Sequence, residues 1–164
     1  MRVGLISDTH VPTQVARLPA DAIEALAGCE AILHAGDLVD VCVLDVLGRI
    51  APVYAVRGNM DGGAAADLPR RRVVELGGVR IGLTHGAGGG GDIEERVFRE
   101  LVGEGVDVMV FGHTHRPVVR TVGGMLMVNP GSPAGGRDGS GRSVAILTLD
   151  GTVSAEVVPL EGTG

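Results

Sequence analysis

The sequence predicts an α+β fold in which two mixed β-sheets pack against each other and helices cover their outer faces. In the first third of the chain, short apolar runs alternate with segments of helical spacing, which is the pattern of a parallel β-α-β-α-β series. In the rest of the chain, three pairs of apolar runs flank a two-residue turn, which is the pattern of antiparallel hairpins. Two stacked sheets accommodate both kinds of strand.

The parallel series begins with a strand-like run directly after Met1 and is interrupted by two helical segments. Gly28 and Gly48 follow these segments, and glycine is typical of helix ends. A short apolar run follows each helix, as expected for a mostly parallel sheet. The expected elements are the strand 2–7, the helix 19–27, the strand 31–35, the helix 39–47 and the strand 52–56.

The second part of the chain combines hairpins with one helix and one further buried strand. Gly77-Gly78, Gly123-Gly124 and Asp150-Gly151 are two-residue turns of the kind that hairpins favour. Apolar residues at every fourth position predict one amphipathic helix. The expected elements are the strands 73–76 and 79–84, the helix 93–102, the strand 106–111, and the strand pairs 118–122 with 125–128 and 143–149 with 152–157.

Length, charge and composition limit the classes of function. A chain of 164 residues without a linker or repeat predicts one domain, residues 1–164. A net charge of −6 with no Trp, one Tyr and two Phe argues against a nucleic-acid binder, so nucleic acid is expected only as a small nucleotide substrate. The chain shows no signal peptide or membrane span, which predicts a cytoplasmic protein without a membrane partner.

Seven polar side chains stand at the ends of five apolar runs. The runs cover residues 3–7, 31–36, 53–58, 79–84 and 108–112. If they are strands of one core, the side chains that follow them gather at one edge. These side chains are Asp8, His10, Asp37, Asn59, His85, His113 and His115.

Two carboxylates, four imidazoles and one amide suit divalent transition metals better than calcium, which prefers oxygen ligands alone. Asp8 and His10 are two positions apart, as are His113 and His115, and in an extended chain such pairs point to the same side. Only two acids serve what resembles two sites, so one aspartate is expected to bridge two ions. Asp37 is the better candidate, because Asp8 already pairs with His10.

These residues resemble the motifs of the calcineurin-like metallophosphoesterases. Five blocks occur in the family's order over roughly residues 3 to 133: Asp8-x-His10, Gly36-Asp37, Gly58-Asn59, His85 and Gly112-His113-x-His115. The short chain, Gly58-Asn59-Met60-Asp61 and Asn129-Pro130-Gly131-Ser132 are most similar to the small YfcE-type phosphodiesterases. The resemblance implies a metallo-dependent phosphatase-like fold, a four-layer α/β/β/α sandwich.

The resemblance also implies a binuclear phosphodiesterase mechanism, in which a hydroxide bridging two divalent ions attacks phosphorus in line. Manganese is the expected metal, and Ni²⁺, Fe²⁺, Co²⁺ and Zn²⁺ are alternatives. Asp37, Asn59 and His85 are the expected catalytic residues. The implied ligands are Asp8, His10, Asp37 and His115 for the first ion, and Asp37, Asn59, His85 and His113 for the second.

The expected substrate is a small phosphodiester. Asn59, Arg57 and Arg116 are the expected substrate-binding residues, although either arginine could simply pair with a surface acid. Phosphomonoesterases of the family carry a histidine where this chain has Met60, and many close relatives carry one where it has Ala87. The site therefore lacks an evident general acid, a group typically worth ~10²–10⁴-fold in rate, so diesters should be cleaved faster than monoesters.

Some roles stay open in the sequence. A protein-binding scaffold of the same fold, similar to the retromer subunit of sorting coats, is the alternative to an enzyme, but that subunit lacks part of the histidine set that is complete here. Hairpin edges could pair in a homodimer or a higher homo-oligomer. His34 is expected to pack in the core or behind a ligand. Asp61 could orient a ligand or cap a turn, and Asn129 and Ser132 are expected to lie in a turn that buttresses the site, mainly through turn chemistry.

Overall fold

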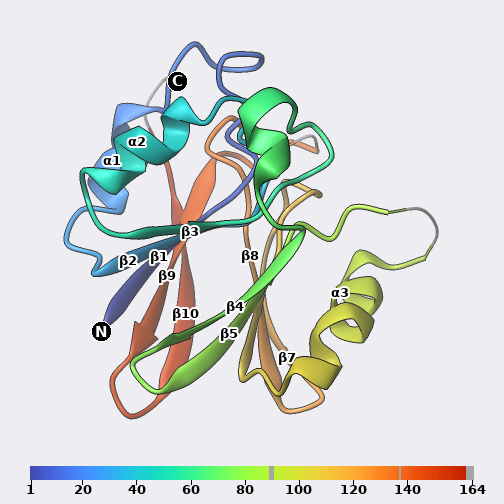
Figure 1. The fold of residues 1–164 in the computed structure, drawn as a ribbon. Helices are drawn as coiled ribbons and strands as arrows, with labels where there is room; N and C mark the ends of the chain where they lie inside the picture. Colours follow the sequence, from blue (N-terminus) through green and yellow to red (C-terminus); the bar gives the residue numbers. More distant parts are fainter. Residues whose placement is uncertain (89–90, 137, 162–164) are drawn as a thin grey trace.

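Ten strands form two five-stranded sheets in the computed structural model, which describes residues 1–88, 91–136 and 138–161 (Figure 1). The order in the first sheet is β10-β9-β1-β2-β3. These strands are β1 (Arg2–Ile6), β2 (Ala31–His34), β3 (Val53–Ala55), β9 (Ser143–Leu149) and β10 (Val153–Pro159). Strands β1, β2 and β3 run parallel, whereas β9 is antiparallel to both of its neighbours.

The second sheet has the order β4-β5-β6-β8-β7. It consists of β4 (Arg71–Leu76), β5 (Val79–Thr84), β6 (Val108–Val110), β7 (Pro117–Val122) and β8 (Met125–Pro130). The three inner strands are parallel, and a hairpin partner closes each side in the antiparallel sense. Both sheets are therefore mixed, as the sequence predicts.

Helices cover the outer face of each sheet, which gives four layers in the order α/β/β/α (Figure 1). The helices α1 (Ala20–Ala25) and α2 (Cys42–Gly48) pack on the first sheet, and α3 (Ile93–Leu101) packs on the second. Two short 3₁₀ helices, η1 (Gly63–Asp67) and η2 (Val102–Glu104), complete the described elements. Within the described ranges, no helix combines the length and apolarity that crossing a membrane requires.

The alternation of side chains along the strands builds the layers. Val3 and Leu5 of β1 point into the core between the two sheets, whereas Ile6 packs under the helices of the first sheet. Successive side chains of a strand point to opposite faces, so a strand buried on both faces reads as an unbroken apolar run. Such runs hold the strand ends, and the residues that follow them, in fixed positions.

The first sheet is mixed, as predicted, because the hairpin β9–β10 joins the parallel strands β1, β2 and β3 beside β1. Two expected helix boundaries need correction. The helix expected at 39–47 begins at Cys42, because Val39 has a φ of 74°, outside the helical region. The helix expected at 19–27 covers only Ala20–Ala25. The 3₁₀ helix η1 was not predicted at all.

Candidate metal centre

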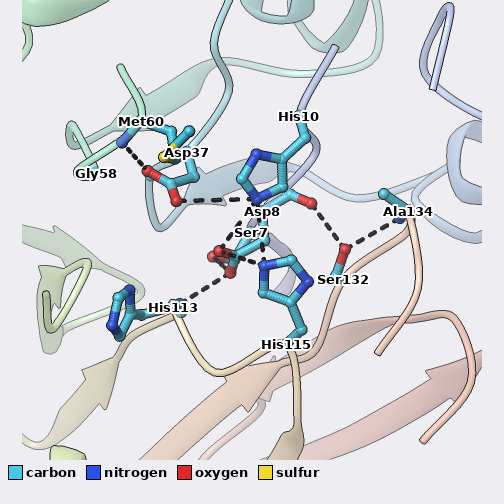
Figure 2. A network of polar contacts seen from close by, with 12 residues as sticks. Ser7, Asp8, His10, Asp37, Gly58, Met60, His113, His115, Ser132 and Ala134 are labelled. Carbon is cyan, nitrogen blue, oxygen red and sulfur yellow. Dashed lines mark hydrogen bonds and ion pairs between the residues drawn. The ribbon is translucent and has the colours of Figure 1, made fainter. Parts of the chain in front are cut away.

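Loops from both sheets meet at one end of the sandwich and bring most of the predicted site residues together (Figure 2). The sequence placed all of these loops at the edge of one core. The structure shows that β1, β2 and β3 of the first sheet carry Asp8, Asp37 and Asn59 at their ends, and that β5 and β6 of the second sheet carry His85 and His113. The site thus lies where the two sheets adjoin.

Three imidazoles converge on one oxygen of Asp8. Its Oδ1 lies 3.3 Å from Nε2 of His115, 3.8 Å from Nε2 of His10 and 4.0 Å from Nε2 of His85. The two nitrogens of His10 and His115 are themselves only 3.2 Å apart. All four residues are buried.

Asp37 occupies a similar position. Its Oδ2 lies 3.2 Å from Nε2 of His85 and 3.8 Å from Nε2 of His10. Two groups of ligand atoms therefore suit a metal ion, one from Asp8, His10 and His115 and one from Asp8, Asp37 and His85. Asp8 is common to both groups, whereas Asp37 belongs to one of them and lies near both His10 and His85.

Three buried atoms of this cluster have no hydrogen-bond partner: Oδ1 of Asp8, Oδ2 of Asp37 and Nε2 of His85. Buried polar atoms are nearly always satisfied in folded proteins, so a group of three that face one another needs an explanation. Divalent cations bind carboxylate oxygens and imidazole nitrogens together. The residues present therefore fit the metal that the resemblance implies.

The second oxygen of each carboxylate is held by hydrogen bonds. Oδ2 of Asp8 accepts the hydroxyl of Ser7 at 2.5 Å and the backbone N–H of His113 at 2.9 Å. Oδ1 of Asp37 accepts the backbone N–H of Met60 at 2.8 Å (Figure 2). Each aspartate thus uses one oxygen to fix its orientation and turns the other into the cluster.

The backbone is left-handed at five of the predicted ligands. Among the described residues, six that are not glycine have a positive φ, and five of these are predicted ligands: Asp8, His10, Asp37, His113 and His115. The explanation that Asp8 and His10 point together because the chain is extended is therefore wrong. Such backbone conformations cost on the order of 1–3 kcal/mol each and concentrate at functional sites.

Gly58 and Gly112 stand at positions that leave no room for a side chain. A Cβ at Gly58 would lie 2.6 Å from the backbone nitrogen of Asp37, and a Cβ at Gly112 would lie 2.7 Å from Oδ2 of Asp8. Both distances are shorter than side-chain carbons tolerate. The glycines therefore let neighbouring loops approach the two aspartates closely.

The charges of the cluster stabilise one another. Burial alone would raise the pKa of Asp8, but the ring of His115, 3.3 Å from Oδ1, and the charge of His85 bring that pKa below its usual value. Burial opposes the ionisation of Asp37 as well, yet the ring of His85, 3.2 Å from Oδ2, lowers the pKa. Burial likewise opposes a charged His85, but the nearby carboxylates of Asp37 and Asp8 raise its pKa. Both carboxylates are therefore available as anionic ligands at neutral pH.

Two polar side chains behind the predicted ligands bond to the backbone of the ligand-bearing loops. The hydroxyl of Ser132 donates to the backbone carbonyl of Asp8 at 2.7 Å, and the amide of Asn129 donates to the carbonyl of Gly112 at 2.9 Å. Asn129 also accepts the N–H of Gly131 at 2.9 Å, as expected for a residue that shapes this turn. The two residues thus support two of the loops that carry predicted ligands, which is the buttressing expected of the turn.

His34 is fully buried and packs behind the site, as expected. Its Nδ1 accepts the N–H of Gly36 at 3.2 Å, and its Nε2 lies 3.2 Å from the hydroxyl of Thr9. Burial lowers its pKa to about 3, so the ring is neutral. Ser7 and Thr9 gave no signal in the sequence, because a hydroxyl residue beside a ligand is common without any role.

The remaining predicted site residues lie around the cluster. The ring of His113 stands edge-on to that of His85, with centroids 5.2 Å apart. Asn59 is exposed and lines a cavity next to His85 together with Arg57. Arg116 forms an ion pair with Asp138 at 2.6 Å, the surface pairing that the sequence left open. The substrate-binding roles stay predictions.

A two-sheet sandwich with buried aspartates and histidines at its strand ends defines the class of metal-dependent phosphoesterases. The chain belongs to the calcineurin-like phosphoesterase superfamily, whose domain model matches residues 1–152. It is 39% identical over 160 residues to a probable metallophosphoesterase of Methanothermobacter thermautotrophicus, covering 96% of this chain and 92% of the relative. It is 28% identical to a phosphodiesterase of Methanocaldococcus jannaschii, over 82% of this chain and 86% of that one.

Two solved structures show the same fold. Vps29 of Entamoeba histolytica in complex with zinc superposes with a TM-score of 0.78 at 29% identity, over 96% of this chain and 98% of that chain. The Thermotoga maritima protein TM1076 superposes with a TM-score of 0.72 at 35% identity, over 97% and 99% of the two chains. The first of these similarities concerns a protein whose structure holds a metal.

Proposed function

We propose that this protein is a phosphodiesterase that hydrolyses small phosphodiesters with two divalent metal ions, manganese being the expected metal. The observation that carries the proposal is the group of three unsatisfied buried atoms, Oδ1 of Asp8, Oδ2 of Asp37 and Nε2 of His85. A cluster of this kind is costly to the fold without a cation to bind it. Membership of a superfamily of phosphoesterases supplies the reaction class.

The ligand sets follow the resemblance. Asp8, His10, Asp37 and His115 would hold the first ion, and Asp37, Asn59, His85 and His113 the second. The close approach of His10 to His115 at 3.2 Å supports the first set. The position of Oδ2 of Asp37 between His10 and His85 suits the bridging role, although Oδ1 of Asp8 lies between the same two rings.

Two divalent ions, when bound, lower the pKa of a water molecule so that it can attack phosphorus, and they neutralise charge on the phosphoryl oxygens. The chain's own contribution is to fix the ligands. The backbone N–H groups of Met60 and His113 orient the two carboxylates, and the buried position of His10, His85 and His115 excludes bulk water from their nitrogens. Asp37, Asn59 and His85 are proposed as the residues nearest to the reacting phosphate.

The preference for diesters rests on two positions. The side chain of Met60 is 53% exposed beside Asp37, where a histidine could protonate a leaving group, and Met60 cannot. Ala87, at the other position, is exposed near His85 and has no acidic group that could donate a proton. Poor leaving groups therefore receive no proton from these two side chains.

The test uses purified protein with Mn²⁺ and two chromogenic substrates, bis(4-nitrophenyl) phosphate and 4-nitrophenyl phosphate. We expect faster cleavage of the diester, and loss of both metal and rate in Asp37→Asn and in His85→Ala. Met60→His should raise monoesterase activity relative to diesterase activity. Faster monoester cleavage by the unaltered protein, or full activity in both ligand variants, would overturn the proposal.

A non-catalytic scaffold is the second candidate, because Vps29 proteins are among the structural neighbours. Metal binding does not separate the two candidates, since one Vps29 structure holds zinc. Measured turnover of a phosphodiester does separate them. Metal-loaded protein that binds two ions and cleaves none of a panel of aryl diesters would favour the scaffold.

A further inference from the structure

A cavity of about 140 Å³ opens beside His85, on the side of the proposed second ion. Of the proposed metal ligands, only His85 and Asn59 line it. The cavity is therefore next to the cluster and separate from the space between the two aspartates. A group bound there would be a part of the substrate other than the reacting phosphate.

Two arginines line this cavity without an ion-pair partner. Among the described residues, neither Arg57 nor Arg70 pairs with a carboxylate, whereas five other arginines do: Arg71, Arg99, Arg116, Arg120 and Arg142. Arg57 is anchored by one hydrogen bond from Nη1 to the neutral carbonyl of Ala66, at 2.7 Å. A neutral carbonyl does not offset the positive charge of the guanidinium group, and the other N–H donors of Arg57 remain for another partner.

One carboxylate opposes these two cations among the described lining residues. Glu100 lies at the same cavity, and its Oε2 accepts the hydroxyl of Thr84 at 3.1 Å. It lies beyond ion-pair distance of Arg57 and Arg70, since such a pair would be within 4.0 Å. The lining therefore keeps a net positive charge in a protein whose overall net charge is −6.

We infer that this cavity is a subsite for a second anionic group of the substrate, and that Arg57 and Arg70 determine this specificity. The inference rests on the proposed function and names the substrate class: phosphodiesters whose non-leaving arm carries a carboxylate or phosphoryl group. Water occupies about 30 Å³ per molecule in the liquid, so the cavity has room for one such group. Guanidinium groups bind both anions through paired N–H donors.

The test compares three diesters with the same 4-nitrophenolate leaving group, whose second arm is phenyl, 4-carboxyphenyl or 4-phosphonophenyl. With Mn²⁺-loaded protein we expect kcat/KM to be roughly tenfold higher for the anionic arms than for phenyl, a range typical of hydrogen bonds between charged groups. The ratio between the two anionic arms tells whether carboxylate or phosphoryl is preferred. Added salt should reduce the preference.

Variants at this cavity should change the preference for anionic arms in opposite directions. Arg70→Gln should bring the ratio of anionic to neutral arm close to one, and Glu100→Gln should increase it. Arg71→Gln is the matched control, because Arg71 is the next residue, pairs with Glu104 at 3.2 Å and does not line the cavity. Its ratio should equal that of the unaltered protein.

Equilibrium binding separates this inference from the proposed function. Calorimetry of the Mn²⁺-loaded protein with diphenyl phosphate and with phenyl 4-carboxyphenyl phosphate needs no turnover. A preference for the carboxylate that Arg70→Gln removes would support the subsite even if no diester were cleaved. Equal rates and equal dissociation constants for neutral and anionic arms would overturn it.

Discussion

The carboxylate of Asp61 accepts the backbone N–H of Asp37 at 3.0 Å, and so fixes the main chain of a proposed metal ligand from another loop. The same carboxylate accepts the N–H of Gly58 at 2.7 Å and that of Val39 at 2.7 Å. The loops after β2 and β3 are thereby tied to one side chain. The two roles that the sequence left open for Asp61, orienting a ligand and capping a turn, are both present.

Asp61→Ala should weaken Mn²⁺ binding by roughly 10–100-fold, the usual cost of removing a group that orients a metal ligand. Asp61→Asn, which keeps one acceptor oxygen, should lose less. Titration of the metal-free protein with Mn²⁺ measures both. Asp67→Ala is the control, since Asp67 is exposed on the nearby η1. Unchanged affinity in Asp61→Ala would show that the loops hold Asp37 without it.

Gly58→Ala should destabilise the fold, because the new Cβ would lie 2.6 Å from the backbone nitrogen of Asp37 and overlap its carboxylate. Overpacking of this kind typically costs ~1–3 kcal/mol. Urea unfolding with and without Mn²⁺ measures the loss of stability and of metal binding together. Gly62→Ala, where a Cβ meets nothing within 4 Å, should behave like the unaltered protein. Equal stability of the two variants would contradict the close approach.

His34 should make the metal-free protein sensitive to acid. Burial lowers its pKa from 6.5 to about 3, so the unfolded chain takes up a proton at a higher pH than the folded protein does. Stability should therefore fall as the pH drops from about 6.5 towards 3, and this contribution is complete above the unfolded value.

The measurement is urea unfolding of the metal-free protein between about pH 4 and about pH 7. In His34→Gln, which has no titrating ring, the slope of unfolding free energy against pH should be shallower by up to about 1.4 kcal/mol per pH unit. Parallel slopes for the variant and the unaltered protein would mean that His34 is protonated in the fold.

Metal affinity should rise with pH. The pKa of His85 is raised above 6.5 in the metal-free protein, so below that raised pKa a cation must displace a proton from the ring. Mn²⁺ binding measured at several pH values should tighten through this range and release protons into the buffer. An affinity that does not change with pH, with no proton release, would contradict the charged state of His85.

The sequence predicted which residues gather at this end of the sandwich because each follows a strand whose apolar pattern is local and readable. It could not predict their left-handed backbone, since the φ of Asp8 and His10 depends on neighbours from distant loops. The bond from Ser132 to the carbonyl of Asp8 spans 124 positions and leaves no local pattern. In the same way, the turn at Asp150-Gly151 predicted a hairpin but not which sheet the hairpin joins.

We propose that Asp37 bridges two metal ions and that Asp8 holds the first of them. Anomalous diffraction from a crystal grown with excess Mn²⁺ locates the ions. We expect two peaks about 3.5–4 Å apart, each within coordinating distance of a carboxylate oxygen of Asp37 and of at least one of the four histidines, and one of them also close to Asp8. No peak at these residues, or strong peaks only elsewhere on the protein, would contradict this proposal.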